Sequence, residues 1–432
     1  MEAMVELPSA GQEQIALWLS ETAGTQEAAV RNASSHLEAA QNVPKFALCL
    51  LMLAAGGPEK GQRVAAATYL KNFLRSHWSD EKAMSAEERL EFRNQLMEVL
   101  LRVDGLVLKL LAEAFRLVAI HDFAKNMTWP ELVPAFKAAI QNSNLVNAAG
   151  NSELRTVNVL IGVQTLTKPF QYFLNPTVAR EPVPEQLEIV AKELLAPLHG
   201  IFHHLVQQVA ASKEKGCAQH DNILHVLCKA MHLALKSHMP SAILATLGQW
   251  FNDFVLLLDV VVLEKRMDLP EQQPRLKTWK RVLQICCNLI SRHRKHVDKF
   301  LPSMSNAALK IVGRSANAKD LHPMQQRVVS LAFDLVSNIL ETGPGWRLMA
   351  PHFSNLLETA IFPALIMKEK DLIEWTEDED EYLRKNLPSD MDEASGWKED
   401  LLTPRQSALN LLSLIATAKV KIQILQILGG PN

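Results

Sequence analysis

Three side chains able to bind a metal ion lie at helical spacing near the middle of the chain. His225, Cys228 and His232 would place two imidazoles and a thiol on one face of a helix, and both groups are common zinc ligands. Cys228, however, also belongs to an apolar series with helical spacing. The pattern therefore favours a core cysteine flanked by interface histidines, and we expect no metal site and no cofactor.

Sequence motifs typical of enzymes are absent. The chain has no G-x-x-x-x-G-K-[ST] loop, no G-x-G-x-x-G turn, no G-x-S-x-G elbow and no H-E-x-x-H pair. Gly56, Gly57, Lys60 and Gly61 lie together, but their spacing does not fit a phosphate-binding loop and indicates a turn between two helices. We expect no catalytic residues and no enzyme activity.

A dense run of carboxylates interrupts the second half of the chain. Between Lys368 and Asp400 there are 13 acidic residues, and like charges at this density repel one another. We expect residues 368–402 to form a flexible acidic loop. The loop is either a solvated insertion or a site for cargo or a basic partner, in which aromatic rings add packing to electrostatic attraction. The residues of that candidate site are Trp375, Glu377, Asp378, Glu379, Asp380, Glu381 and Tyr382.

The overall charge argues against a protein built to hold nucleic acid. The formal net charge is -2, whereas domains of that class carry a strongly basic face. The best basic run, residues 292–296, suits the C-terminal end of a helix. Five cysteines do not make a disulfide framework in a chain of 432 residues, and the longest apolar runs are too short to span a bilayer. We therefore expect protein partners in the cytosol or nucleus, with no nucleic acid and no membrane insertion.

Apolar residues recur at helical spacing, whereas clean strand-like alternation is nearly absent. The residues of each series lie on one face of a helix and form an apolar stripe, which a single helix cannot bury by itself. The sequence therefore predicts an all-α protein. The stripes are Val107, Leu110, Leu111, Ala114 and Val118; Leu224, Leu227, Cys228, Met231 and Leu235; Val328, Leu331, Ala332, Leu335 and Ile339; and Ala408, Leu411, Leu412 and Ile415.

The distance between stripes indicates repeats. Stripes that start at Val64 and Val107 are 43 residues apart, and those that start at Val328 and Ala408 are 80 apart. HEAT and armadillo repeats run about 40–47 residues, so the second interval fits two repeats. We expect an alpha-alpha superhelix, a solenoid of HEAT- or ARM-type helix pairs; the alternative is a set of unrelated helical bundles. A solenoid offers a long curved surface for protein binding.

Helix starts are marked by threonine and proline. Residues 128–131, Thr-Trp-Pro-Glu, predict a capping box with proline in the first turn, and Thr403-Pro404 repeats the start. Further helices are expected to begin near Glu185 and at Pro323.

The chain divides into four segments on these signals. Residues 1–78 form the N-terminal repeats, 79–367 the continuing solenoid, 368–402 the acidic insertion and 403–432 a further helix. The last segment ends in apolar residues, whereas a solenoid ends in a capping repeat with a polar outer face. We therefore expect the repeat array to be truncated at this end.

The first segment resembles the importin-beta N-terminal domain. The resemblance lies in AAVRNASSHLEAAQNVPKFALCLLML and RVAAATYLKNFLRSHW, above all in Leu70-Lys71-Asn72 and Trp78. Asp122-Phe123 followed by the W-P-x-L run from Trp129 resembles a later repeat of the same family. The pieces PFQYFLNP, EPVPEQL, EWTEDEDEYLRKN and TPRQSALNLL are similar to the importin-seven/eight branch with its plant SAD2-like members. Receptors of this family are far longer than this chain.

The resemblance implies a function in nuclear transport. Family members bind Ran-GTP through inner helices of the N-terminal repeats, contact phenylalanine-glycine nucleoporins on the outer surface and carry protein cargo on the concave face. It also implies a Ran-facing helix that contains Tyr69, Lys71, Asn72 and Arg75, our candidates for contact. Leu70 is expected in the core, and Trp78 is expected to pack the end of that helix.

The leading hypothesis is therefore an importin-like receptor that mediates protein import and is located in cytoplasm, nucleus and nuclear envelope or pore. One alternative is a generic HEAT-repeat scaffold for protein assembly, indifferent to the nucleotide state of Ran. Another is a nuclear export receptor, in which cargo and Ran-GTP bind together rather than compete.

Overall fold

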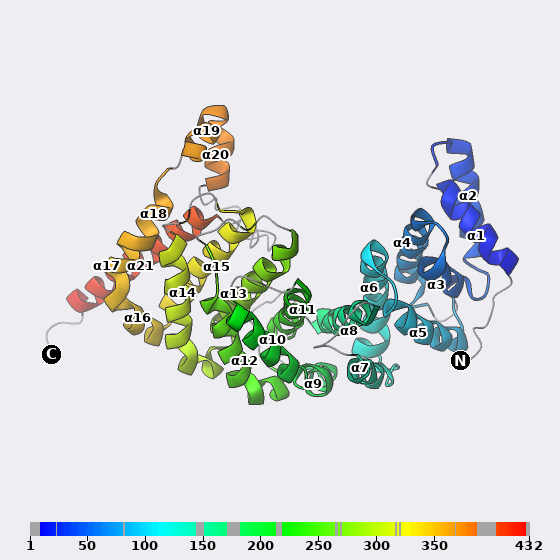
Figure 1. Cartoon of the computed structure of the whole chain (residues 1–432), viewed down its shortest axis with the longest axis horizontal. Coiled ribbons are helices and arrows are strands. Elements are labelled where there is room, and N and C mark those ends of the chain that lie inside the picture. The colour runs from blue at the N-terminus through cyan, green and yellow to red at the C-terminus, as the bar shows by residue number, and fades with distance from the viewer. Residues whose placement is uncertain are drawn as a thin grey trace. The chain divides into compact units, whose positions relative to one another are not determined.

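The computed structural model describes residues 9–22, 24–80, 83–143, 151–170, 182–212, 218–263, 267, 270–315, 318, 321–367, 369–386 and 403–428. Every regular element in these ranges is a helix, and they contain no strand (Figure 1). The all-α prediction is confirmed. The chain forms two compact units, Met1–Asn175 with Glu181–Leu198 and Pro176–Arg180 with His199–Asn432, called unit 1 and unit 2 below.

Unit 1 is built from antiparallel helix pairs. Its helices are α1 (Ser9–Thr22), α2 (Glu27–Ala40), α3 (Phe46–Gly56), α4 (Lys60–His77), α5 (Ala86–Leu100), α6 (Gly105–Ala119), α7 (Leu132–Gln141), α8 (Asn151–Thr167) and α9 (Glu185–Val190), with a π turn at Ile120–Lys125 after α6 and another at Ala191–Leu195 after α9. Within each pair α3 packs on α4, α5 on α6 and α7 on α8. Between pairs α4 packs on α6 and α6 on α8. The second helices of successive pairs thus form one layer.

One hydrogen bond between pairs and one close crossing within a pair fix the helices of unit 1. Lys45 adopts a left-handed backbone conformation (φ 65°) before α3, and its backbone N–H donates to Glu88 Oε1 at 2.5 Å. Glu88 also completes a capping box with Ser85 at the start of α5, so one carboxylate serves two helix starts. At the α7–α8 crossing, a Cβ on Gly162 would lie 2.3 Å from the Phe136 ring. Only glycine lets these helices approach so closely.

Unit 2 repeats the paired arrangement. Its helices are α10 (His199–Ser212), α11 (Ala218–Leu235), α12 (Ser241–Asp259), α13 (Gln273–His293), α14 (Leu301–Ser315), α15 (Pro323–Leu340), α16 (Gly343–Met349), α17 (Phe353–Leu356), α18 (Phe362–Leu365), α19 (Glu369–Glu377), α20 (Glu379–Asn386) and α21 (Pro404–Leu428), with a π turn at Leu357–Ile361. The helices α11, α13, α15 and α21 pack in series, and α10, α12, α14 and α16 form a second series. Each unit is therefore two helices thick.

The stripes read from the sequence form the two cores. All five members of the α11 stripe and all five of the α15 stripe are buried, at 5% exposure or less. In the α6 and α21 stripes only Leu110 and Leu412 are partly exposed. Since every fully buried leucine contributes about 2 kcal/mol, these stripes are the main source of stability.

Three of the four expected helix starts are confirmed. The helices α9, α15 and α21 begin at Glu185, Pro323 and Pro404, and Thr403 forms a capping box with Gln406. The fourth prediction is wrong. The helix α7 begins at Leu132 without a side-chain cap, because both the hydroxyl and the backbone N–H of Thr128 donate to the carbonyl oxygen of Asp122.

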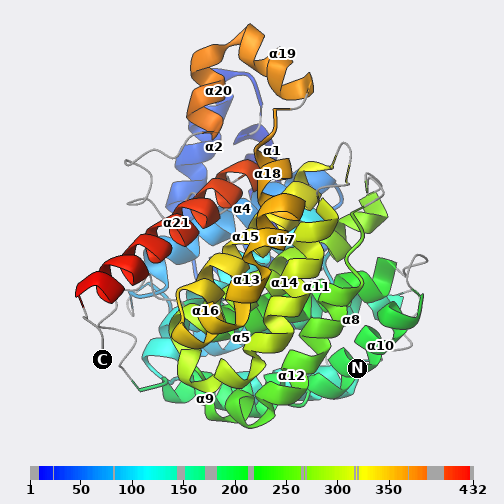
Figure 2. The same cartoon turned by 90° about the vertical axis from the view of Figure 1, so that its left-hand side faces the viewer.

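The acidic insertion is not a loop over its first half. Residues 369–386 form α19 and α20, which pack on one another and project from the rest of unit 2 (Figures 1 and 2). The prediction of a flexible loop is wrong there, because Trp375 packs on Tyr382 and Arg405 binds both helices. The remainder, residues 387–402, lies outside the described residues.

One helix, α12, is long and apolar enough to cross a membrane by length and composition. Its large side chains Trp250, Phe251 and Phe254 are nevertheless buried at about 1% exposure in the core of unit 2. That burial accounts for the apolar composition of α12.

Candidate protein-binding site

The helix α4 presents the residues that the sequence singled out for contact. Asn72 and Arg75 are exposed, and Lys71 is half-buried. Leu70 is fully buried and Trp78 is 2% exposed, as expected for core residues. The helix thus offers a polar face beside an anchored apolar face.

Tyr69 is held more firmly than its neighbours on this face. Its hydroxyl accepts a hydrogen bond from Gln41 Nε2 at 2.8 Å, and its ring packs edge-on against Phe46 at 6.0 Å. Burial raises the pKa of the Tyr69 hydroxyl, with a further contribution from Glu38, while the bond from Gln41 lowers it. Tyr69 therefore has a structural role in joining α4 to the turn after α2, and its half-buried ring leaves less surface for a partner than Asn72 or Arg75.

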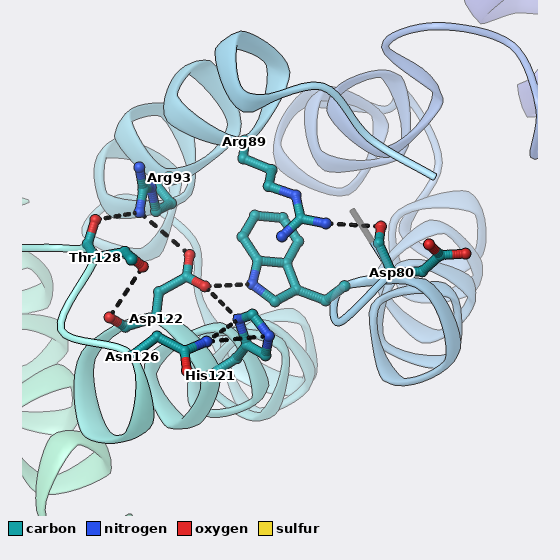
Figure 3. A network of polar contacts seen from close by, with 8 residues as sticks. Asp80, Arg89, Arg93, His121, Asp122, Asn126 and Thr128 are labelled. Carbon is teal, nitrogen blue, oxygen red and sulfur yellow. Dashed lines mark hydrogen bonds and ion pairs between the residues drawn. The ribbon is translucent and has the colours of Figure 1, made fainter. Parts of the chain in front are cut away.

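A buried carboxylate fixes the end of α4 to the next helix pair. Asp122, 3% exposed, accepts a hydrogen bond from Trp78 Nε1 at 3.1 Å, and its other oxygen accepts from Arg93 Nη1 at 3.3 Å (Figure 3). His121 Nδ1 lies 2.7 Å from the first oxygen. We call Asp122, Trp78, Arg93 and His121 the Asp122 cluster. It connects α4, α5 and the π turn after α6.

Two arginines of α5 extend this cluster. Arg93 donates to the carbonyl oxygen of Thr128 at 2.8 Å, and Arg89 donates to the carbonyl oxygen of Asp80 at 2.7 Å (Figure 3). Arg93 also lies over the Trp129 ring, and Arg89 lies over the Trp78 ring. Cations over aromatic faces add to the packing. The cluster orients α4, so the direction in which Asn72 and Arg75 point is set from α5 and the π turn.

The acidic candidate site forms a second polar surface, in unit 2. Arg405 donates to Asp371 Oδ2 at 2.6 Å, to the Ile366 carbonyl oxygen at 3.1 Å and to the Tyr382 hydroxyl. Tyr382 is 6% exposed, and its ring packs edge-on on Trp375 at 5.4 Å.

The aromatic and acidic members of this candidate therefore differ. Tyr382 faces the interior of the hairpin, so it cannot be the exposed aromatic anchor that the sequence suggested. Glu377, Asp378, Glu379 and Asp380 remain exposed, and Glu381 is half-buried. The exposed carboxylates of residues 377–380 lie at the hairpin tip, where α19 ends and α20 begins.

Comparison with known proteins identifies the N-terminal helices. Residues 33–102, which contain α3, α4 and α5, match the importin-beta N-terminal domain. The chain is 25% identical to human importin-8 over 437 residues, covering 93% of this chain and 39% of that protein. It is 22% identical to the importin beta-like SAD2 homolog of Arabidopsis thaliana, covering 90% and 38%. The chain thus carries an importin-beta N-terminal domain and, over most of its length, is similar to the N-terminal part of importin-beta family proteins.

Solved structures of this family share the fold. The exportin Cse1 in its cargo-free, cytoplasmic state superposes with a TM-score of 0.73 at 16% identity, over 96% of this chain and 42% of that one. Kap121p bound to RanGTP gives a TM-score of 0.54 at 14% identity, over 95% and 33%. The HEAT-repeat solenoid class expected from the sequence is confirmed. The chain spans about two fifths of the length of the curated importin-beta relatives that it matches.

A groove next to the importin-beta N-terminal domain was not foreseen from the sequence. It has a volume of about 510 Å³ and lies between α7 and the elements that follow Pro184, lined by Phe123, Met127, Trp129, Val133 and Ile189 among others. Met127 and Ile189 are exposed at 59% and 39%. Its residues come from segments some sixty positions apart, which explains why no local pattern indicated it.

The histidines near α11 do not form a metal site. Cys228 is fully buried in the core, and burial raises the pKa of its thiol far above the ordinary range. In the described parts of the chain, no three His, Cys, Asp or Glu side chains gather where they could hold a metal ion. His225 and His232 flank the core stripe, as the sequence indicated.

A separate pair of histidines encloses a buried carboxylate in unit 2. Asp253, 1% exposed, lies 3.0 Å from His199 Nε2 and 2.8 Å from His203 Nδ1. The pair joins α10 to α12 and, with Gly200 and Asn252, borders a hollow of about 340 Å³. Asp253 thus bridges two helices of one layer in the way that Asp122 does in unit 1.

Proposed function

We propose that this chain acts as a nuclear transport receptor that binds Ran-GTP through the polar face of α4 and mediates import of protein cargo into the nucleus. Phenylalanine-glycine nucleoporins are the proposed partners at the pore. The proposal places the protein in cytoplasm, nucleus and nuclear envelope. The acidic hairpin α19–α20, with Trp375 and residues 377–381 at its surface, is proposed as a contact for cargo or another basic partner.

One observation carries the proposal. The matched importin-beta N-terminal domain holds α4 by Leu70 and Trp78 and leaves Asn72 and Arg75 in solvent. Exposed polar residues on a helix that is anchored by its buried side chains form a rigid recognition surface. A relative with this fold, Kap121p, has been solved bound to RanGTP, which supports Ran as the partner of this surface.

The test is a pull-down with Ran locked in its GTP or GDP form. The wild-type chain is expected to retain Ran-GTP and not Ran-GDP, and Arg75→Glu is expected to weaken retention by about tenfold or more because it places a carboxylate at the contact. Arg31→Glu is the matched control, since Arg31 is an exposed cation on another helix of unit 1. Equal retention of both nucleotide forms would favour the generic scaffold and refute the proposal.

Export is a second candidate direction, favoured by the likeness to the exportin Cse1. The two directions differ in the sign of coupling between ligands: in import, Ran-GTP lowers cargo affinity, and in export it raises it. Titrating cargo against the full-length protein with and without Ran-GTP distinguishes them.

A further inference from the structure

Most of the large apolar side chains that unit 2 exposes lie in one short segment. Among the described residues of the whole chain, five such side chains fall between positions 362 and 373, in α18, in α19 and in the turn that joins them. Single exposed apolar residues are ordinary on a protein surface, whereas a group of them marks a surface that binds a partner. The five are Phe362, Ile366, Met367, Leu372 and Ile373, which we call the apolar patch and which are between 42% and 64% exposed.

Two hydrogen bonds from one arginine hold the parts of the apolar patch together. Arg405 Nη2 donates to the carbonyl oxygen of Ile366 at 3.1 Å and to Asp371 Oδ2 at 2.6 Å. A single guanidinium nitrogen thus fixes the residue that follows α18 beside the first turn of α19. Because Leu372 comes directly after Asp371, the exposed side chains on the two sides of this nitrogen lie close together.

The apolar residues of α19 lie on a side of that helix that the hairpin leaves open. Leu372 and Ile373 are adjacent and both are exposed. The residues one turn before and one turn after them, Glu369 and Thr376, are exposed as well. Trp375, on another side of the helix, packs against α20. The hairpin stands clear of the other helices of unit 2 in both views, so this side of α19 faces solvent (Figures 1 and 2).

The edge of the apolar patch is strongly acidic. From Glu369 to Glu381 the sequence has eight acidic residues and one lysine. The carboxylates of residues 377–380, at the hairpin tip, are exposed, and no ion pair within the described part of the chain uses them. The patch therefore attracts a partner that carries cations and repels one that carries anions.

This charge decides between possible occupants of the apolar patch. A second copy of the chain would bring two acidic edges together, and like charges across an interface cost free energy. The cytoplasmic leaflet of a membrane carries negative charge, so it is repelled for the same reason. A protein segment that has Lys or Arg beside its apolar side chains matches both the patch and its edge.

The shape of the surface favours a helix as the bound segment. An extended segment binds by adding a strand to the free edge of a sheet, and the described residues contain no strand. A helix instead packs its side chains between those of another helix, with anchors three and four positions apart. The exposed side of α19 offers such a helical surface.

We propose that the apolar patch binds an amphipathic helix of a partner protein, with an apolar stripe that is edged by lysine or arginine. The stripe packs on Leu372 and Ile373, and the flanking cations reach the carboxylates of residues 377–380. This assignment rests on the contact with a basic partner proposed above for the hairpin, and it specifies the secondary structure of that partner and the apolar side chains that hold it.

The test is fluorescence anisotropy with the full chain and a labelled peptide of leucine and lysine whose leucines recur at helical spacing. A scrambled peptide of the same composition carries the same charge but no stripe. The wild type is expected to bind the first peptide at least about tenfold more tightly. Leu372→Gln with Ile373→Gln is expected to remove that advantage. Leu90→Gln with Leu106→Gln, two leucines of similar exposure in unit 1, is the matched control and should change it less than about twofold.

The outcomes distinguish this assignment from the contact on which it rests. Equal binding of the two peptides, lost in Glu377→Gln with Glu379→Gln but not in Leu372→Gln with Ile373→Gln, would show that the hairpin recognises charge alone. The amphipathic helix would then be wrong, while the contact with a basic partner would stand. If neither peptide binds, the contact fails as well. Sedimentation that shows a dimer, converted to monomer by Leu372→Gln with Ile373→Gln, would make a second copy the occupant and overturn the proposal.

Discussion

The Asp122 cluster of unit 1 and the two histidines of α11 in unit 2, His225 and His232, are both polar, both partly buried and both placed between neighbouring helices, but their surroundings differ. Asp122 is surrounded by donors of opposite or complementary charge, from Trp78, Arg93 and His121. The described charged groups that act on His225 and His232 are all cations.

This difference separates a charged group that joins helices from groups that stay neutral. A buried carboxylate with donors to both oxygens has no contact left to offer, so its role is to hold α4 in place. Burial and neighbouring cations instead favour the neutral form of His225 and His232. The two regions should therefore respond differently when charges are removed.

Asp122→Ala should have the largest effect. It leaves Arg93, whose side chain is 12% exposed, without its carboxylate and leaves the buried Trp78 Nε1 without an acceptor. Removing one partner of a buried ion pair costs about 3–5 kcal/mol. Urea unfolding of the full chain, with hydrogen exchange of α4 and α5 as local readout, measures the loss.

Asp122→Asn is the control for that prediction. It keeps an oxygen for Trp78 but removes the charge opposite Arg93, so we expect an intermediate loss. If both variants unfold like the wild type, the cluster does not hold α4 and the contrast with His225 and His232 fails.

Acidification should have the next largest effect, and it should act on unit 2. In the folded state the pKa of His225 and of His232 is about 3, against an ordinary value of 6.5. Above about pH 6.5 both states are neutral at these sites and the full contribution to stability is present. Between pH 6.5 and about 3 the unfolded chain binds protons that the folded chain does not. The free energy of unfolding therefore decreases as the pH is lowered through this range.

The measurement is urea unfolding at several pH values, followed by hydrogen exchange of α11. The variant with His225→Gln and His232→Gln should lose part of the pH dependence over this window. If the free energy of unfolding of this variant depends on pH as steeply as that of the wild type, both imidazoles are protonated in the folded state. That outcome would contradict their placement beside cations.

Much of the fold could be predicted from the sequence, because burial of an apolar stripe is a local property. The α11 and α15 stripes are buried as predicted. Predictions failed where a distant group decided the outcome. The capping box at Thr128 was wrong because the Asp122 carbonyl takes the Thr128 donors, and the acidic loop was wrong because Arg405, more than twenty residues later, holds Tyr382 and Asp371.

The sites divide in the same way. The burial of Leu70 and Trp78 within the α4 motif follows from helical periodicity. The electrostatic environment of His225 does not, because Lys229 and Lys280 belong to separate helices. Only packing of α11 on α13 places both lysines near this imidazole.

Arg405→Ala should have a smaller, local effect. Arg405 links α21 to α19 and α20, and a charged hydrogen bond of this kind contributes about 2 kcal/mol. We expect faster hydrogen exchange in residues 369–386 with little change elsewhere. Arg405→Lys keeps the charge but not the planar fork, so it should restore only part of the protection. Unchanged exchange in Arg405→Ala would mean that packing of Trp375 on Tyr382 suffices to order the hairpin.

Lys277→Gln should have the smallest effect on stability and is the most direct test of the contrast. Because the exposed Lys277 repels the protonated form of His225, its loss should leave the free energy of unfolding unchanged within about 0.5 kcal/mol, while the pKa of His225 rises. NMR of selectively labelled histidines follows that rise, with Lys295→Gln as a control that should not produce it. A loss of stability as large as that expected for Asp122→Ala, or a His225 titration that does not move, would contradict the contrast.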